Sequence, residues 1–242
     1  MPIELGRIEA IFRYPIKSMA GESLESADLG WHGIEGDRRI GVRRVDDQSG
    51  FPWLTATKLP DLIRFRPLPA GTSPSLPTHV RTPSGEELPV FSDELSADIA
   101  RRYGSPVQML HVRHGVFDDA SISVIATDTV DEIARLSSTT PDVRRFRPNL
   151  VVRLLHPAAF AEDAWLGANL TFGSAANAPT VAATMHDVRC SMVNLDPESA
   201  HLTPEVLKSV VRANGNHAGI YGTVTHIGRL EVGQPIFLHP CD

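Results

Sequence analysis

Hydrophobic residues recur along this chain mostly in short alternating runs, the spacing of β-strands with one buried face. The runs are separated by turns rich in glycine and proline, of which the 242 residues contain 18 and 19. This punctuation favours many short strands joined by turns. The predicted strands cover residues 5–14, 23–29, 37–45, 62–65, 78–82, 87–91, 107–112, 121–125, 150–155, 169–172, 179–188, 220–227 and 235–238.

Helical spacing of apolar residues occurs in fewer places and always over short segments. Strands therefore outnumber helices, and the pattern predicts a mainly β (α+β) fold with three to four helices and a barrel component, mostly antiparallel. The predicted helices are Asp93–Tyr103 with Asp93 as N-cap and Gly104 as its stop, a helix capped by Thr127 or Asp128, a single turn over Glu162–Leu166, and a helix with Thr203 as N-cap and Pro204 at N1.

The length of the chain allows one large domain or two small ones. The composition shifts between His114 and Asp119, and this shift predicts a boundary between residues 1–114 and residues 115–242. Prolines and serines are concentrated over residues 67–77, a composition typical of a surface loop.

The formal charge of −6 argues against a general nucleic-acid or anionic-membrane binder. The N-terminus lacks the apolar core of a signal peptide, and no run approaches the ~18 apolar residues of a membrane span. Two cysteines exclude a disulfide scaffold, a CxxC zinc site and a set of iron–sulfur ligands. We therefore expect a cytoplasmic protein with no membrane span.

Cys190 follows an apolar run and is the one thiol in the body of the chain, since the other cysteine, Cys241, is the penultimate residue. Arg189 directly precedes it, and a neighbouring cation favours the thiolate, the form that attacks electrophiles and binds soft metals. Alternatively, Cys190 is a small buried hydrophobe. His186 could orient or protonate a ligand here, and Asp196 could accept hydrogen bonds or start a turn.

Four basic residues stand next to turns and strand ends: Lys17, Arg38, Arg147 and Arg189. They either converge on one anion site or are four unrelated surface cations, and sequence alone leaves both possibilities open. His111 and His114 are three apart on a predicted strand and so point to opposite faces, which argues against a shared metal. The nucleophile-elbow, zincin, dinucleotide-binding and P-loop motifs are absent from the sequence.

Several short motifs together resemble the MOSC-domain molybdenum proteins, in particular those with an additional N-terminal β-barrel domain. The mitochondrial amidoxime-reducing component and its bacterial relatives belong to that group. The resemblance extends from about Ile8 to Phe237. Its motifs, in chain order, are Tyr14-Pro15-Ile16-Lys17-Ser18, Gly36-Asp37-Arg38-Arg39, Trp53-Leu54-Thr55, Asp119-Ala120-Ser121, Phe146-Arg147-Pro148-Asn149-Leu150-Val151-Val152, Glu162-Asp163-Ala164-Trp165, Arg189-Cys190 and Val193-Asn194-Leu195-Asp196-Pro197.

The resemblance implies an antiparallel β-barrel MOSC domain over residues 115–242, preceded by a smaller β-rich domain over residues 1–114. It also implies a mononuclear molybdenum site held by a pyranopterin, the molybdenum cofactor. Cys190 matches the cysteine whose thiolate completes the metal's coordination, which makes it the expected metal ligand and catalytic residue. The cofactor-binding residues implied by the matching positions are Lys17, Ser18, Arg38, Ser121, Arg147, Asn149 and Arg189.

The implied function is reduction of small N-hydroxylated substrates such as amidoximes, hydroxylamines and N-hydroxylated bases. Because these 242 residues lack iron–sulfur cysteines, we expect the electrons to come from a separate ferredoxin- or cytochrome-type protein. Two alternatives are a carrier of the cofactor or of sulfur, and a binding module without cofactor. The chain departs from its relatives at Thr57, where they usually have arginine, and after Cys190, where they have a threonine-rich run. These departures concern substrate preference.

Overall fold

The computed structural model describes residues 2–68 and 76–240. The remaining positions, among them most of the predicted proline loop and Cys241, lie outside the described residues. The helices are α1 (Asp93–Tyr103), α2 (Thr127–Ser137) and α3 (Glu205–Asn214), with 3-10 helices η1 (Pro60–Arg64), η2 (Val143–Arg145), η3 (Ala161–Trp165) and η4 (Ser191–Asn194). The strands are β1 (Ile3–Arg13), β2 (Glu22–Leu24), β3 (Ser26–Gly30), β4 (Gly33–Ile34), β5 (Ile40–Arg44), β6 (Arg66–Leu68), β7 (His79–Arg81), β8 (Glu87–Pro89), β9 (Val107–His111), β10 (Ile122–Ala126), β11 (Leu150–Leu154), β12 (Asn169–Phe172), β13 (Thr180–Val188), β14 (His217–His226), β15 (Gly228–Glu231) and β16 (Pro235–His239).

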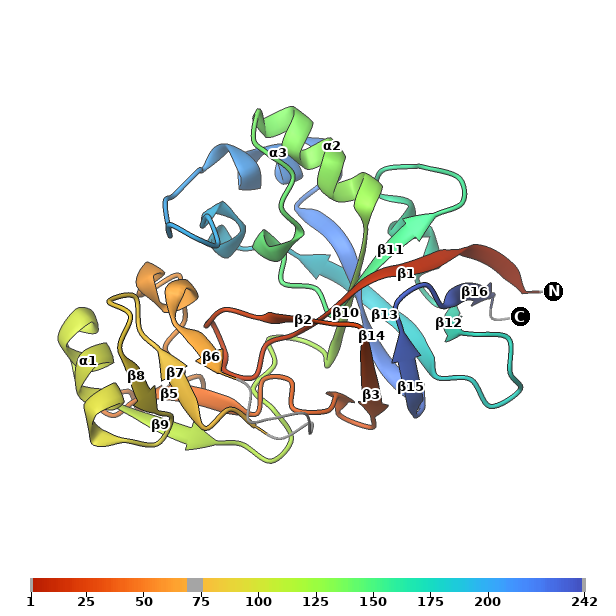
Figure 1. Cartoon of the computed structure of the whole chain (residues 1–242). Helices are drawn as coiled ribbons and strands as arrows, with labels where there is room; N and C mark the ends of the chain where they lie inside the picture. Colours follow the sequence, from red (N-terminus) through yellow and green to blue (C-terminus); the bar gives the residue numbers. More distant parts are fainter. Residues whose placement is uncertain (1, 69–75, 241–242) are drawn as a thin grey trace.

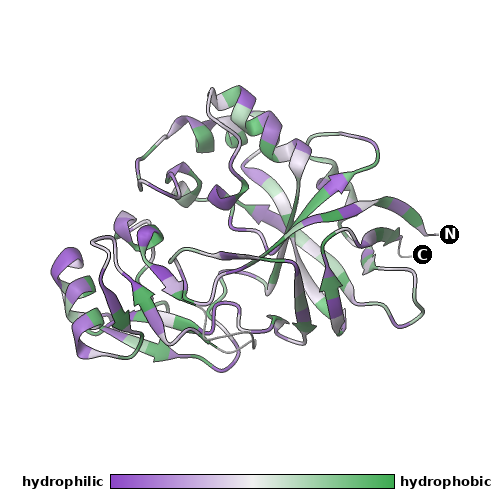
Figure 2. Cartoon of the chain, in the orientation of Figure 1, coloured by the Kyte–Doolittle hydropathy of each residue, from purple (hydrophilic) through white to green (hydrophobic). Residues whose placement is uncertain are grey.

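Seven strands close into a barrel in the order β11-β10-β14-β13-β12-β16-β1, and β1 returns to pair with β11 (Figure 1). The β10–β11 pair is parallel and the other pairs around the ring are antiparallel. Alternate side chains fill the interior: Val181 and Ala183 of β13 are buried, and they pack with Ile8, Ile122 and Phe172 from other strands. Where hydrophobic and polar residues alternate along these strands (Figure 2), the hydrophobic residues are therefore those that face the closed core.

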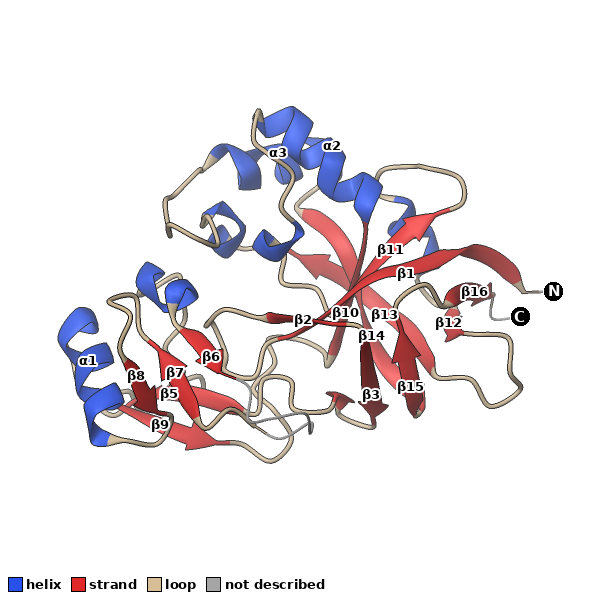
Figure 3. Ribbon diagram, in the orientation of Figure 1, coloured by secondary structure: helices blue, strands red, loops and turns tan. Residues whose placement is uncertain are grey.

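A smaller lobe lies beside the barrel and contains the β5–β9 pair, the sheet β6-β7-β8, η1 and α1 (Figure 3). Its separate core includes Val42, Leu62, Phe65 and Val80, with Ile99 of α1 packed against them. Each lobe thus buries its own apolar cluster. A cavity can form between the two lobes, where chain segments pass from one to the other.

Helices α2 and α3 pack together against one end of the barrel (Figure 1). Val130 and Ile133 of α2 and Val206 and Val210 of α3 share a buried cluster with Phe146. This third cluster holds the segment after η2, which contributes to the cavity described below.

The structure confirms a mainly β fold with three helices and a barrel, and it corrects several local predictions. Of residues 62–65, predicted as a strand, the first three belong to the 3-10 helix η1 and Phe65 is its C-cap. Leu62 and Ile63 are both buried, and adjacent buried residues do not alternate. Residues 23–29 form two strands in place of one. The N-cap of α1 is Ser92, whose side chain accepts from the Leu95 N–H, and α3 begins one residue later than predicted, at Glu205.

The first strand belongs to the barrel, since β1 pairs with both β11 and β16. The barrel is therefore built from both ends of the chain, and the predicted boundary at residue 114 lies between β9 of the smaller lobe and β10 of the barrel. None of the helices in the described residues has the length and apolar character needed to cross a membrane.

Candidate functional site

A cavity of about 490 Å³ lies where the barrel meets the smaller lobe. Its volume is in the range of small-molecule and cofactor sites. The residues that line it include most of those predicted for the site, contributed by segments far apart in the chain: Lys17, Ser18, Arg38, Arg147, Arg189 and Cys190.

Cys190 stands just beyond β13, at the N-cap of η4, and it is exposed. The pairing of β13 with β14 shifts register twice near its end, between Ala183 and Met185 and between His186 and Val188. Such bulges change the direction in which a strand presents its side chains. Beyond these shifts Asp187 is buried while Val188 is 56% exposed, and Cys190 lies at the cavity.

The Arg189 side chain is buried and its N–H groups are engaged within the protein. Nε donates to the Ala218 carbonyl (2.8 Å), Nη1 donates to the Phe146 carbonyl (2.7 Å), and Nη2 pairs with Asp187 Oδ2 (2.8 Å). These contacts join the end of β13 to β14 and to the segment after η2. Arg189 therefore fixes the position of the loop that presents Cys190.

Arg38 is held by a buried carboxylate next to it in sequence. Asp37, fully buried, accepts from Arg38, from the Tyr14 N–H (2.7 Å) and from Asn149 Nδ2 (3.1 Å). Arg38 Nη2 donates to the Arg147 carbonyl (3.0 Å). This network places two of the predicted cations side by side at the floor of the cavity.

Arg147 is 9% exposed, and its guanidinium lies 4.1 Å from the centroid of the Tyr14 ring. Nη1 donates to the Met19 carbonyl (2.7 Å), but the buried Nη2 has no hydrogen-bond partner among the described residues. Burial, together with the nearby Arg38 charge, lowers the pKa of Arg147 to about 10, so the group is still charged at neutral pH. A buried unpaired donor is costly, and an anionic or polar ligand would supply the missing acceptor.

Lys17 is buried at the cavity wall and its Nζ donates to Asp118 Oδ1 (2.8 Å) and to the Val116 carbonyl (3.3 Å). Burial lowers the pKa of Lys17, and the charge of Asp118 opposes that shift. The lining contains six basic residues against three carboxylates, so the cavity keeps an excess of positive charge.

Three of the cavity residues have left-handed backbone, with φ of 67° at Ser18, 51° at Arg38 and 52° at Arg147. This region is uncommon for residues other than glycine, and it costs about 1–3 kcal/mol unless surrounding contacts fix it. Such residues cluster at binding and catalytic sites. The left-handed backbone at these three predicted site residues indicates a functional site at this cavity, independently of the sequence motifs.

Sequence reasoning missed several titratable residues that also line the cavity, among them Asp187 and Tyr221. Asp187 is 1% exposed, accepts from Ser123 Oγ (2.7 Å) and pairs with Arg189. Burial raises its pKa to about 6 against the opposing charge of Arg189. Burial and the neighbouring Asp187 also raise the pKa of the Tyr221 hydroxyl. The stretch before Cys190 was visible in the sequence, but the pairing of Asp187 with Arg189 and its place on the cavity wall were not.

Two predicted residues, Ser121 and Asn149, are not on the cavity wall. Asn149 is 1% exposed; besides donating to Asp37 it accepts from the Ser123 N–H (3.2 Å). Its place in the structure is to support the Asp37–Arg38 pair. The carbonyl of Ser121 packs against Gly33, where a Cβ would approach it to 2.6 Å.

The two residues whose roles the sequence left open also lie outside the cavity wall. Asp196 Oδ1 accepts from the Glu198 and Ser199 N–H groups, so Asp196 starts a turn. His186 Nδ1 lies 3.1 Å from Asp163 Oδ1, and its ring stacks on His217 at 4.2 Å between centroids.

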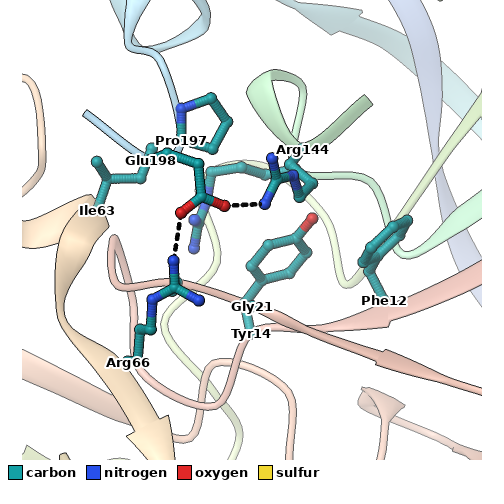
Figure 4. Close-up of a pocket in the computed structure, with 10 residues that line it drawn as sticks. Phe12, Tyr14, Gly21, Ile63, Arg66, Arg144, Pro197 and Glu198 are labelled. Carbon is teal, nitrogen blue, oxygen red and sulfur yellow. Dashed lines mark hydrogen bonds and ion pairs between the residues drawn. The ribbon is translucent and has the colours of Figure 1, made fainter. Parts of the chain in front are cut away.

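A second, much smaller hollow of about 50 Å³ adjoins the first and shares Arg147 with it. Figure 4 shows Glu198 between Arg66 and Arg144, with Tyr14 on the wall. The buried Tyr14 hydroxyl has no hydrogen-bond partner among the described residues. The Glu198 bridge connects β6 of the smaller lobe to η2.

Within the described residues, no three His, Cys, Asp or Glu side chains are grouped so that they could hold a metal ion. The cavity does offer the Cys190 thiol, a soft ligand, beside several cations. This donor set fits an anionic group that brings further metal ligands of its own.

Comparison with protein families gives two matches. The MOSC domain matches residues 111–237, and the MOSC N-terminal beta barrel domain matches residues 5–140. No curated protein sequence matches this chain. Among solved structures, the YuaD protein from Bacillus subtilis is 13% identical, with both chains fully covered and a TM-score of 0.55, which is a likeness of fold alone. YiiM from Geobacillus stearothermophilus is 19% identical over 49% of this chain and 53% of its own, with a TM-score of 0.39.

Proposed function

Since the chain belongs to the MOSC-domain proteins that carry a MOSC N-terminal β-barrel domain, we propose that its cavity binds the molybdenum cofactor and that the protein reduces small N-hydroxylated compounds. The observation that supports this most strongly is the convergence of Lys17, Arg38 and Arg147 on the cavity that contains Cys190. Unrelated surface cations would be dispersed, whereas these are buried and adjacent.

The cations and the thiol have different parts in this proposal. Cys190 would be the protein's ligand to the metal as a thiolate. Arg147, whose Nη2 has no partner among the described residues, and Lys17 would hold the phosphate and polar pterin. Ser18 lies at the same wall. Arg189 would keep the Cys190 loop in place through its backbone contacts.

When bound, the cofactor supplies a metal that passes two electrons and accepts an oxygen atom. In the net reaction, the N–O bond of the substrate breaks, two electrons and two protons are consumed, and an N–H compound and water are formed. The electrons would come from a separate ferredoxin- or cytochrome-type protein. Asp187, which lines the same cavity as Cys190 and has its pKa raised to about 6, and Tyr221 are the cavity groups suited to hold protons.

The second candidate function is a carrier that delivers the cofactor, or a persulfide on Cys190, to other enzymes. The exposure of Cys190 favours it, because a transferred group must reach a partner's acceptor. Both candidate functions require the same cavity. The reductase releases a reduced substrate from it, whereas the carrier releases the cofactor or the sulfur itself.

The two functions are separated by measuring benzamidoxime reduction with a chemical electron donor alongside cofactor transfer to a metal-free molybdoenzyme. The reductase predicts turnover that is lost in Cys190→Ala and Cys190→Ser. The matched control is Cys241→Ala, which removes the other cysteine and is expected to keep activity. Transfer without reduction would favour the carrier, and full turnover in Cys190→Ala would overturn the reductase.

A further inference from the structure

Besides its cations, the cavity has several large apolar side chains in its lining. Phe51 and Trp53 contribute from the smaller lobe, and Val188 and Met192 contribute from either side of Cys190. Phe51 is 41% exposed and Val188 is 56% exposed. Large apolar side chains that remain exposed around a cavity mark a surface that a ligand can cover.

Trp53 is held rigidly at this position. Its six-membered ring packs against Gly41, where a Cβ would come within 2.6 Å of Cε3. The backbone on both sides is fixed as well, because Leu54 N donates to the Val42 carbonyl (2.7 Å) and Arg44 N donates to the Pro52 carbonyl (2.8 Å). A wall held in this way loses little side-chain freedom when a ligand packs on it.

The aromatic rings of this wall are available for stacking. Neither Phe51 nor Trp53 belongs to a stacked pair of rings among the described residues. Lys17 Nζ lies 5.4 Å from the centroid of the Phe51 ring, so the apolar wall begins where the cationic floor ends. A ligand that fits both parts has an apolar ring directed outward and its reacting polar group directed toward Cys190.

We infer that Trp53 and Phe51 select substrates in which the N-hydroxylated group is attached to a planar aromatic ring, with Val188 and Met192, on either side of Cys190, also covering the ring. This inference rests on the proposed reductase function and names the substrate class of the same cavity. Aromatic rings gain both from burial of area and from stacking, whereas a small aliphatic substrate leaves most of this wall uncovered.

The test compares benzamidoxime with acetamidoxime, its small aliphatic counterpart, in two ways. The first is equilibrium binding of each compound to metal-free full-length protein by calorimetry, which does not depend on turnover. The second is KM for each compound in the molybdenum-loaded protein. Trp53→Ala is expected to weaken benzamidoxime binding and raise its KM by about tenfold, with less than a twofold effect for acetamidoxime.

Three further variants keep the test decisive. Trp53→Phe retains a ring and should recover most of the lost affinity, and Phe51→Ala, at an exposed position, should give a smaller loss in the same direction. Trp31→Ala removes a tryptophan that is 60% exposed and not on the cavity wall, and should change nothing. Equal effects of Trp53→Ala on the two compounds, or no binding preference for benzamidoxime in the unaltered protein, would overturn the inference. Absence of molybdenum from the purified protein would instead count against the proposed function, since ring binding to the metal-free protein is measured separately.

Discussion

The Arg147 guanidinium lies over the Tyr14 ring, 4.1 Å from its centroid, and keeps one buried nitrogen without a hydrogen-bond partner among the described residues. A protein bears the cost of such a group when a ligand supplies the missing acceptor. The two residues thus connect the barrel's first strand, through the loop that follows it, to the cationic floor of the cavity.

Arg147→Gln should separate ligand binding from stability. Glutamine keeps a donor near the Met19 carbonyl but removes the charge, so we expect molybdenum content to fall at least tenfold. The free energy of unfolding of the metal-free protein should change by no more than about 1 kcal/mol, because the lost contacts are offset by removal of a buried unpaired donor. Metal analysis and urea unfolding measure the two effects.

Arg212→Gln is the matched control, since Arg212 is exposed on α3. It should alter neither quantity. A loss of several kcal/mol in Arg147→Gln, with metal content unchanged, would show that Arg147 is structural and that the anion is held elsewhere.

Asp187 should make the stability of the metal-free protein depend on pH. Burial raises the pKa of Asp187 from 3.8 to about 6, so the folded state binds this proton more tightly than the unfolded chain. Its contribution is fully present below pH 3.8 and is lost as the pH rises through about 6. This rise in the pKa of Asp187 corresponds to a change of at most about 3 kcal/mol in the free energy of unfolding.

Urea unfolding at a series of pH values tests this, with Asp187→Asn as the comparison. The asparagine does not titrate, so the unfolding free energy of the variant relative to the parent should rise between pH 4 and pH 6. Parallel pH profiles for the two proteins would mean that the Arg189 charge fully offsets burial, and that Asp187 is ionised throughout this range.

Ser18→Gly should relieve the left-handed backbone at φ 67°. We expect the free energy of unfolding to rise by about 0.5–1 kcal/mol, because glycine adopts this region without a Cβ penalty. The hydroxyl at the cavity wall is lost at the same time, so cofactor retention should fall. Thermal unfolding and metal analysis give the two readouts.

Ser138→Gly provides the control, because Ser138 has φ 55° at the exposed end of α2, away from the cavity. It should stabilise to a similar extent and leave cofactor content unchanged. If Ser18→Gly lowers stability, the hydroxyl contributes more to the fold than its backbone costs.

The sequence predicted the barrel strands well where buried and exposed residues alternate, as along β1 and β12. Strand β10 was also predicted, although all five of its residues are buried. The prediction failed at η1. Leu62 and Ile63 are consecutive and both buried, which suits a 3-10 turn and not a half-buried strand. The pairing of β1 with β11 and β16 could not be predicted from the local pattern, because it depends on how the whole sheet closes into a barrel.

The order of the motifs along the chain was enough to predict several of the residues that line the cavity. Lys17, Arg38 and Arg147 meet at one cavity with Cys190. No local signal distinguished Arg147, which has one nitrogen without a partner in the described part of the chain, from Arg189, whose donors are engaged. Asp187 was missed because nothing in the local pattern shows its pairing with Arg189 or its hydrogen bond to Ser123. These features depend on hydrogen bonds across the fold.

The central claim is that this cavity holds molybdenum with Cys190 as a ligand, and the most direct test is molybdenum analysis combined with X-ray absorption at the metal. Protein made in a cofactor-producing host should contain about one molybdenum per chain, and Cys190→Ser should lose metal or show one sulfur ligand fewer. An unaltered protein without molybdenum, or a Cys190→Ser protein with the same metal content and the same sulfur ligands, would contradict the claim.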